Sequence, residues 1–146
     1  MIIVDVNVLV TAHRVDLPDH AAVHAWLTAA VTGVRTVAIP DLCLTGLVRL
    51  VTNHRIFPQP TAVEQALGFC EAVLAAPATQ RLGGGSGTWD AFAALVRRHG
   101  MRANDIPDTY LAALALEHRA VLATSDRGFA RFADLKVLDP ATAGVG

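Results

Sequence analysis

Short apolar runs alternate with longer amphipathic segments along most of the chain. The runs with the length and β-branched content of strands are residues 2–6, 36–39, 79–82, 120–124 and 136–138. Between them, apolar residues at helical spacing predict helices over residues 19–31, 42–51, 61–76, 88–99 and 106–118. Strands that alternate with helices of this length form parallel sheets covered on both faces. The pattern therefore predicts an α/β fold with a mainly parallel central sheet flanked by helices.

Length and composition predict one globular domain over residues 1–146. The chain is 53% hydrophobic and 17% charged, and its size allows a core that needs neither disulfides nor a structural metal. Cys43 and Cys70 lie among apolar residues, so we expect both in this core. No apolar run approaches the roughly 18–20 residues of a membrane-spanning helix, so we expect no membrane association. Because Asp5 interrupts the first apolar run and no basic segment precedes it, we expect a cytoplasmic protein without a secretory signal.

The charge balance excludes a generally basic, nucleic-acid-coating protein. The chain has 12 basic and 13 acidic residues, with a formal net charge of −1. A protein with this balance has no overall field that draws it to nucleic acid or to an anionic membrane. Any binding of nucleic acid must therefore depend on a local cluster of residues.

Acidic side chains follow predicted strands and open a predicted helix. Asp5 and Asp126 each stand where an apolar strand ends, and Asp105 and Asp108 lie at the start of the helix near Ile106. Ligands of parallel sheets bind beyond the carboxyl ends of the strands, so we expect these carboxylates to converge on one crevice. Clustered carboxylates repel one another unless a cation neutralises them, which indicates a site for Mg²⁺, with Mn²⁺ as a substitute. Each acid taken alone is equally consistent with a helix cap or a buried hydrogen-bonded carboxylate.

Four motifs occur in a fixed order and together cover nearly the whole chain. They are residues 2–9 (IIVDVNVL), 47–57 (LVRLVTNHRIF), 104–113 (NDIPDTYLAA) followed by 116–118 (LEH), and 122–132 (LATSDRGFARF). In this order they resemble the PIN-domain nucleases and, among these, the VapC toxins of bacterial VapBC toxin–antitoxin pairs. The resemblance implies a PIN-like fold with helices on both faces of a parallel sheet.

The resemblance also implies a Mg²⁺-dependent endoribonuclease toxin that hydrolyses RNA phosphodiester bonds and inhibits translation. Its implied partners are a cognate VapB-like antitoxin, an RNA substrate of the tRNA or rRNA class, and a second copy of the chain in a homodimer. By motif position, Asp5, Asp108 and Asp126 are the catalytic acids and metal ligands. Asn7 and Thr124 match small polar residues beside the first and last acids, where they orient a carboxylate or a metal-bound water.

Two positions depart from the family pattern. Gly46 aligns with a glutamate of many members, and Gly128 with a frequent additional aspartate. Fewer carboxylates weaken a second metal site more than the first, and Asp105 is the nearest substitute ligand. The alternative function is therefore a catalytically weakened PIN-like domain that binds RNA or protein. A phosphatase-like or nucleotide-binding enzyme also places aspartates at strand ends, but such enzymes carry a phosphate-binding loop that this chain lacks.

RNA binding near an acidic site requires positive charge. The arginines whose positions suit this role are Arg14, Arg49 and Arg127, together with Arg55 and Arg131.

Two further patterns indicate other chemistry only weakly. His20 and His24 have the spacing of a zinc-binding helix face, but no third ligand or catalytic glutamate accompanies them. The glycine-rich residues 83–87 (GGGSG) lack the Lys-Ser/Thr that follows a phosphate-binding loop, which favours a flexible connection.

Overall fold

The computed structural model describes residues 1–144. Five strands of this part of the chain form one parallel sheet. The strand order is β3-β2-β1-β4-β5. The strands are β1 (Ile2–Val4), β2 (Val37–Pro40), β3 (Thr79–Leu82), β4 (Val121–Ala123) and β5 (Lys136–Leu138). The predicted α/β fold with a parallel sheet is confirmed.

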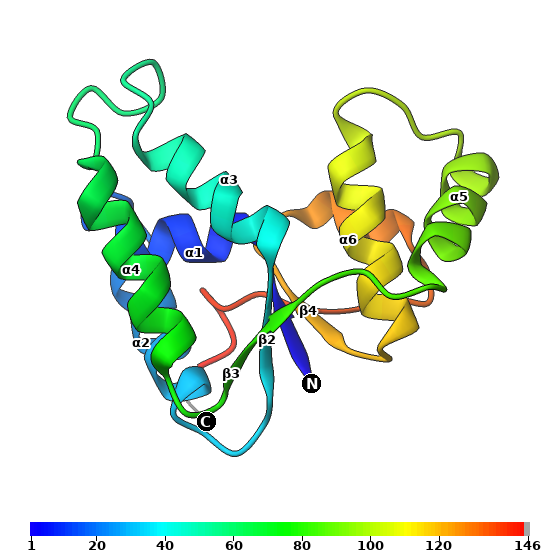
Figure 1. Cartoon of the computed structure of the whole chain (residues 1–146), viewed down its shortest axis with the longest axis horizontal. Helices are drawn as coiled ribbons and strands as arrows, with labels where there is room; N and C mark the ends of the chain where they lie inside the picture. Colours follow the sequence, from blue (N-terminus) through cyan, green and yellow to red (C-terminus); the bar gives the residue numbers. More distant parts are fainter. Residues whose placement is uncertain (145–146) are drawn as a thin grey trace.

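The helices pack as two groups on opposite sides of the sheet (Figure 1). The first group is α1 (Val6–His13), α2 (His20–Val31), α3 (Asp41–Val51) and α4 (Val63–Ala75). The second is α5 (Thr88–His99), α6 (Asp105–Glu117) and the short 3₁₀ helix η1 (Arg127–Arg131). Because all strands run in the same direction, their carboxyl ends meet at one edge, between α3 and α6. None of the helices described for residues 1–144 is long and apolar enough to cross a membrane.

The core lies around the central strands. Ile3, Val4, Ile39 and Leu122 are fully buried, because β1, β2 and β4 are covered by helices on both faces. Cys43 and Cys70 are free thiols buried in the same core, as their apolar neighbours predicted.

The first strand is shorter than predicted. It ends at Val4, and residues from Val6 onward form helix α1, which the apolar pattern did not predict. The side chain of Asp5 accepts a hydrogen bond from the backbone N–H of Val6 at 2.7 Å and so caps the new helix. Burial of Val8 and Leu9 stabilises α1 despite the low helix propensity of its valines.

The glycine-rich connection 83–87 packs closely against α6. A Cβ on Gly84 would clash with the hydroxyl of Tyr110, and one on Gly87 would lie 3.0 Å from Oε1 of Glu117. The hydroxyl of Thr88 donates a hydrogen bond to the same Glu117 carboxylate. Gly84 and Gly87 therefore allow the backbone of this connection to approach side chains of α6 closely. Close packing, and not only the predicted flexibility, explains glycine at these two positions.

Candidate functional site

Asp5 stands at the carboxyl end of the central strand β1 and is only 5% exposed. Its Oδ1 accepts from the backbone of Val6. Its Oδ2 accepts from Asn7 Nδ2 at 2.8 Å and from Thr124 Oγ1 at 2.7 Å. Two donors on one oxygen and one on the other hold this carboxylate in a single orientation.

Asn7 and Thr124 join the first acid to the last. Strand β4 lies directly beside β1, so Thr124, which follows β4, meets residues that follow β1. Asn7 Nδ2 donates to Thr124 Oγ1 at 2.9 Å, and the backbone N–H of Asp126 donates to the same oxygen at 3.1 Å. The amide oxygen of Asn7 accepts from Ser125 N at 3.2 Å. The network therefore positions Asp5 and the backbone of Asp126 together.

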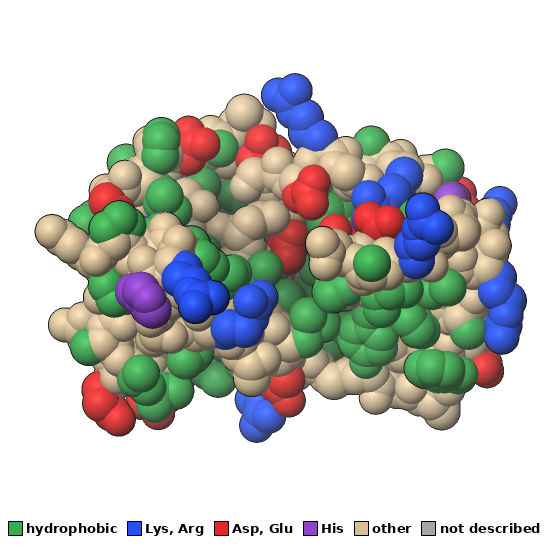
Figure 2. Space-filling view, turned by 90° about the horizontal axis from the view of Figure 1, so that it is seen from above, with side chains coloured by type: hydrophobic (Ala, Val, Ile, Leu, Met, Phe, Trp, Pro, Cys, Tyr) green, Lys and Arg blue, Asp and Glu red, His purple; other side chains and the backbone are tan. Residues whose placement is uncertain are grey.

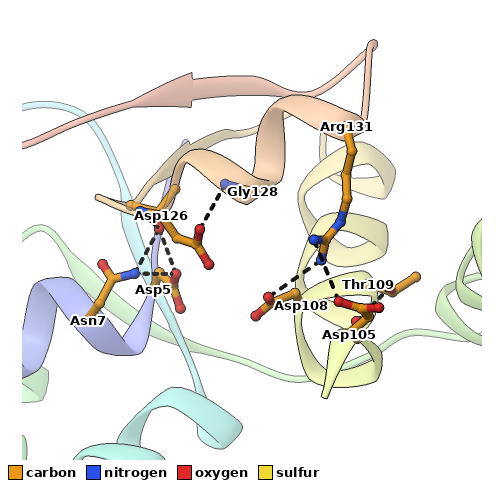
Figure 3. A network of polar contacts seen from close by, with 9 residues as sticks. Asp5, Asn7, Asp105, Asp108, Thr109, Asp126, Gly128 and Arg131 are labelled. Carbon is orange, nitrogen blue, oxygen red and sulfur yellow. Dashed lines mark hydrogen bonds and ion pairs between the residues drawn. The ribbon is translucent and has the colours of Figure 1, made fainter. Parts of the chain in front are cut away.

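Among the remaining acids, Asp126 lies beside Asp5, and Asp108 and Asp105 face this pair from α6 (Figure 3). Asp126 caps η1, because its Oδ1 accepts from the backbone N–H of Gly128 at 2.8 Å. Asp108 and Asp105 lie in the first turn of α6 and face Arg131 of η1, at 3.5 and 3.6 Å respectively. Asp5 and Asp126 thus serve as helix caps and also point toward the same region as Asp108.

The carboxylates of the site affect one another's pKa values. Burial raises the pKa of Asp5; hydrogen bonds from Thr124 and Val6 oppose this, and the charges of Asp108 and Asp126 raise it further. Mutual repulsion of this kind is relieved by a cation.

Asp108 feels the same field. Burial raises its pKa, the charge of Asp126 adds to the increase, the guanidinium of Arg131 opposes it, and Asp105 raises it slightly more. Asp108 is therefore an acid between a like charge on one side and an opposite charge on the other.

The donor set suits a hard divalent cation, because the side chains at this edge offer carboxylate oxygens. Within residues 1–144, no three His, Cys, Asp or Glu side chains approach closely enough to enclose an ion as they stand. Figure 2 looks onto the carboxyl edge of the sheet and shows acidic side chains near its middle, with basic side chains on both sides. The residues therefore fit a metal by chemistry and charge, with Asp5, Asp108 and Asp126 pointing toward one region.

Comparison with known proteins shows the family to which the chain belongs. The family model described as PIN domain matches residues 2–135. Ribonuclease VapC43 of Mycobacterium tuberculosis is 44% identical over 140 residues, which are 96% of this chain and 95% of that protein. The chain belongs to the VapC branch of the PIN-domain family.

Solved structures of VapC proteins share the fold. A chain of the Rickettsia felis VapBC2 structure, bound to a promoter DNA fragment, superposes with a TM-score of 0.70 at 18% identity, covering 94% of this chain and 98% of that one. Mycobacterium tuberculosis VapC20, described as a Sarcin-Ricin loop cleaving toxin, gives a TM-score of 0.65 at 13% identity, covering 90% and 95%. The predicted PIN-like architecture is confirmed by both.

The arginines expected to bind RNA occupy different settings in this PIN-domain chain. Arg49 on α3 and Arg127 on η1 are exposed. Arg14 is mostly covered: it pairs with Asp16 at 2.7 Å and its guanidinium lies 4.2 Å from the centre of the Phe57 ring. Its contacts anchor the segment after α3, which leaves it less available to a ligand than the two exposed arginines.

Arg131 is the residue whose setting the sequence did not predict. Its sequence position predicted only a role in RNA binding. In the structure it forms ion pairs with Asp105 and Asp108. No spacing rule connects a 3₁₀ helix near the end of the chain with the first turn of α6. The sequence feature that links Arg131 to the acidic site is its place in the same motif as Asp126.

Proposed function

We propose that the chain is a Mg²⁺-dependent endoribonuclease that hydrolyses RNA phosphodiester bonds. The observation that carries the proposal is the set of three carboxylates, Asp5, Asp108 and Asp126, which interact electrostatically at the carboxyl edge of the sheet. Parallel α/β folds bind their ligands at this edge. Membership of the VapC branch, whose relatives are named ribonucleases, supports the same reaction.

In this proposal the three carboxylates hold the metal ion, with Mn²⁺ as a functional substitute. The chemistry that a Mg²⁺ held by these residues would supply is polarisation of the phosphate and a lower pKa of the attacking water, which would make a side-chain nucleophile unnecessary. Asn7 and Thr124 keep the Asp5 carboxylate in place through their hydrogen bonds to its Oδ2. Arg49 and Arg127 supply exposed positive charge for the RNA backbone.

The proposed biological role is that of a toxin that inhibits translation in the cytoplasm by cutting RNA of the tRNA or rRNA class. The description of VapC20 as a Sarcin-Ricin loop cleaving toxin supports an RNA substrate of this kind. The VapBC2 structure supports a VapB-like antitoxin as the neutralising partner. A homodimer stays a prediction, which light scattering of the purified protein will test.

The test is cleavage of total bacterial RNA by the purified chain, with Mg²⁺, with Mn²⁺ and with EDTA. We expect discrete fragments with either metal and none with EDTA. Asp126→Asn should fold, as judged by circular dichroism, and should leave the RNA intact. RNA that is bound but never cut by the wild type would favour the binding-module alternative. Cleavage that continues in EDTA, or in variants of all three acids, would overturn the proposal.

A further inference from the structure

Arg131 lies among the acids of the site. Its Nη1 is 3.6 Å from Oδ1 of Asp105, and its Nη2 is 3.5 Å from Oδ2 of Asp108. On its other side, Gly128 separates it from Asp126: a Cβ at Gly128 would lie 3.3 Å from Arg131 Nη1 and 3.0 Å from Asp126 Oδ1. The guanidinium therefore faces both acids of α6, and Asp108 lies between it and the carboxylate of Asp126 (Figure 3).

The side chain of Arg131 is held by charge more than by hydrogen bonds. Its Nε and Nη2 atoms are both buried, and neither has a hydrogen-bond partner. The ring of Phe132, 5.2 Å from Cζ, packs against the guanidinium. The side chain is 32% exposed, but donor atoms that are covered and unpaired are costly unless opposite charges lie nearby, and the carboxylates of Asp105 and Asp108 are those charges here.

Because Nε and Nη2 of Arg131 are covered, neither atom is available to a phosphate without a rearrangement of the side chain. A direct contact of Arg131 with RNA therefore cannot use Nε or Nη2 as they stand. The position of Arg131 is better explained by a fixed positive charge. The guanidinium faces Asp105 and Asp108, and without it these two acids would repel each other and would also be repelled by Asp126.

We propose that Arg131 takes the place of a second metal ion: it neutralises Asp105 and Asp108 and limits the acidic site to one divalent cation. The inference rests on the proposed metal-dependent function. Under this inference, Asp105 pairs with Arg131 and is not a ligand of the metal. Because Gly128 leaves no side chain between Arg131 and Asp126, the guanidinium borders the metal-binding region directly.

The test is direct binding of Mn²⁺ to the full chain, followed by the electron paramagnetic resonance signal of the free ion, with no RNA present. The wild type should bind one Mn²⁺ per chain. Arg131→Gln should bind a second ion, or bind the single ion at least about threefold more tightly, because a competing charge has been removed. Arg131→Lys, which keeps the charge, should bind as the wild type does. Adding Asp105→Asn to Arg131→Gln should return binding to one ion.

Arg127→Gln is the matched control, since it removes the same charge from the same 3₁₀ helix at an exposed position that forms no ion pair within residues 1–144. It should leave the stoichiometry at one ion. Two ions bound by the wild type, or unchanged binding in Arg131→Gln, would overturn this inference and leave the proposed function standing. Loss of Mn²⁺ binding in Arg131→Gln would also overturn it, because Arg131 would then be needed to position Asp108. No Mn²⁺ bound by the wild type would contradict the proposed metal dependence itself.

Discussion

Thr124 donates a hydrogen bond to the Asp5 carboxylate at 2.7 Å, although 119 positions separate the two residues. The same hydroxyl accepts from Asn7 Nδ2 and from the backbone N–H of Asp126. One buried oxygen thus uses its donor and both of its acceptor positions within the site. The relationship makes the orientation of Asp5 depend on Thr124.

Thr124→Val should weaken the site without disturbing the shape of the core. Valine matches threonine in size, but it removes one of the three donors to Asp5 and leaves two N–H groups without an acceptor. We expect a loss of about 1–3 kcal/mol in the free energy of unfolding. We also expect Mn²⁺ affinity to fall about 10–100-fold, the usual effect of removing a group that orients a metal ligand. Urea denaturation and Mn²⁺ titration measure the two effects.

Thr124→Ser is the control, because serine keeps the hydroxyl and removes only a methyl group. It should retain metal affinity within a few-fold of the wild type. Equal metal affinity in the valine and serine variants would mean that the hydroxyl does not orient Asp5.

Stability without metal should depend on pH through Asp5 and Asp108. Their pKa values in the folded protein are raised above the ordinary 3.8, so the folded state binds more protons than the unfolded state at mildly acidic pH. The free energy of unfolding contributed by these groups therefore falls as the pH rises through their raised pKa values. Asp108→Asn removes one of them, and its stability relative to the wild type should increase over the same interval.

Thermal unfolding of both proteins between about pH 4 and pH 8 checks this dependence. In EDTA, the midpoint of Asp108→Asn should gain on that of the wild type as the pH rises. Saturating Mg²⁺ at neutral pH should raise the midpoint of the wild type and have little effect on the variant. Parallel pH profiles for the two proteins would contradict the assignment of Asp108 to the repelling acidic set.

Phe129 should anchor the helix that carries the last acid. It is 1% exposed, lies in η1 between Asp126 and Arg131, and contacts the ring of Phe132 with centroids 6.2 Å apart. Phe129→Ala should lower the free energy of unfolding by about 3–5 kcal/mol, measured by urea denaturation. Trp89→Ala, at a position that is 68% exposed, should change it by only about 0.5 kcal/mol or less. Similar losses in the two variants would show that η1 is not fixed by this ring.

Gly46 should be coupled to Val6, the residue that follows Asp5. A Cβ at position 46 would lie 3.2 Å from Cγ2 of Val6, which is tighter than an ordinary contact. Alanine offers a gain of about 1 kcal/mol over glycine inside a helix. With Val6 present, the cost of this crowding should exceed that gain, so Gly46→Ala should lower the free energy of unfolding. In a Val6→Ala background, the same substitution should stabilise. A double-mutant cycle by urea denaturation measures the coupling, and a stabilising Gly46→Ala in both backgrounds would refute it.

Hydrophobic periodicity was sufficient for most of the fold. The helices near residues 20–31, 41–51 and 88–99 were predicted within a residue or two, because each carries an apolar stripe and a clear end. Helix α1 was missed because its valines continue the β-branched run of β1. Only the capping hydrogen bond from Val6 to Asp5 separates the two elements, and such a bond is not visible in an apolar pattern.

The acids of the candidate site were predicted from their places at strand ends and at a helix start. The structure brings Asp5, Asp108 and Asp126 to one edge, because parallel strands end together. The pairing of Arg131 with Asp105 depends on how η1 packs against α6, a tertiary contact that no local rule supplies. Charges at the edge of a site are thus harder to predict than the strand ends that define it.

Strands β1 and β4 are neighbours, yet one opens the chain and the other lies near its end. During synthesis, a ribosome-bound fragment that lacks β4 carries Asp5 without Thr124 or Asp126 and has an incomplete acidic set. In the proposed nuclease, such a fragment lacks one of the three metal-binding acids. The acidic set is therefore complete only after β4 has been synthesised and has docked beside β1.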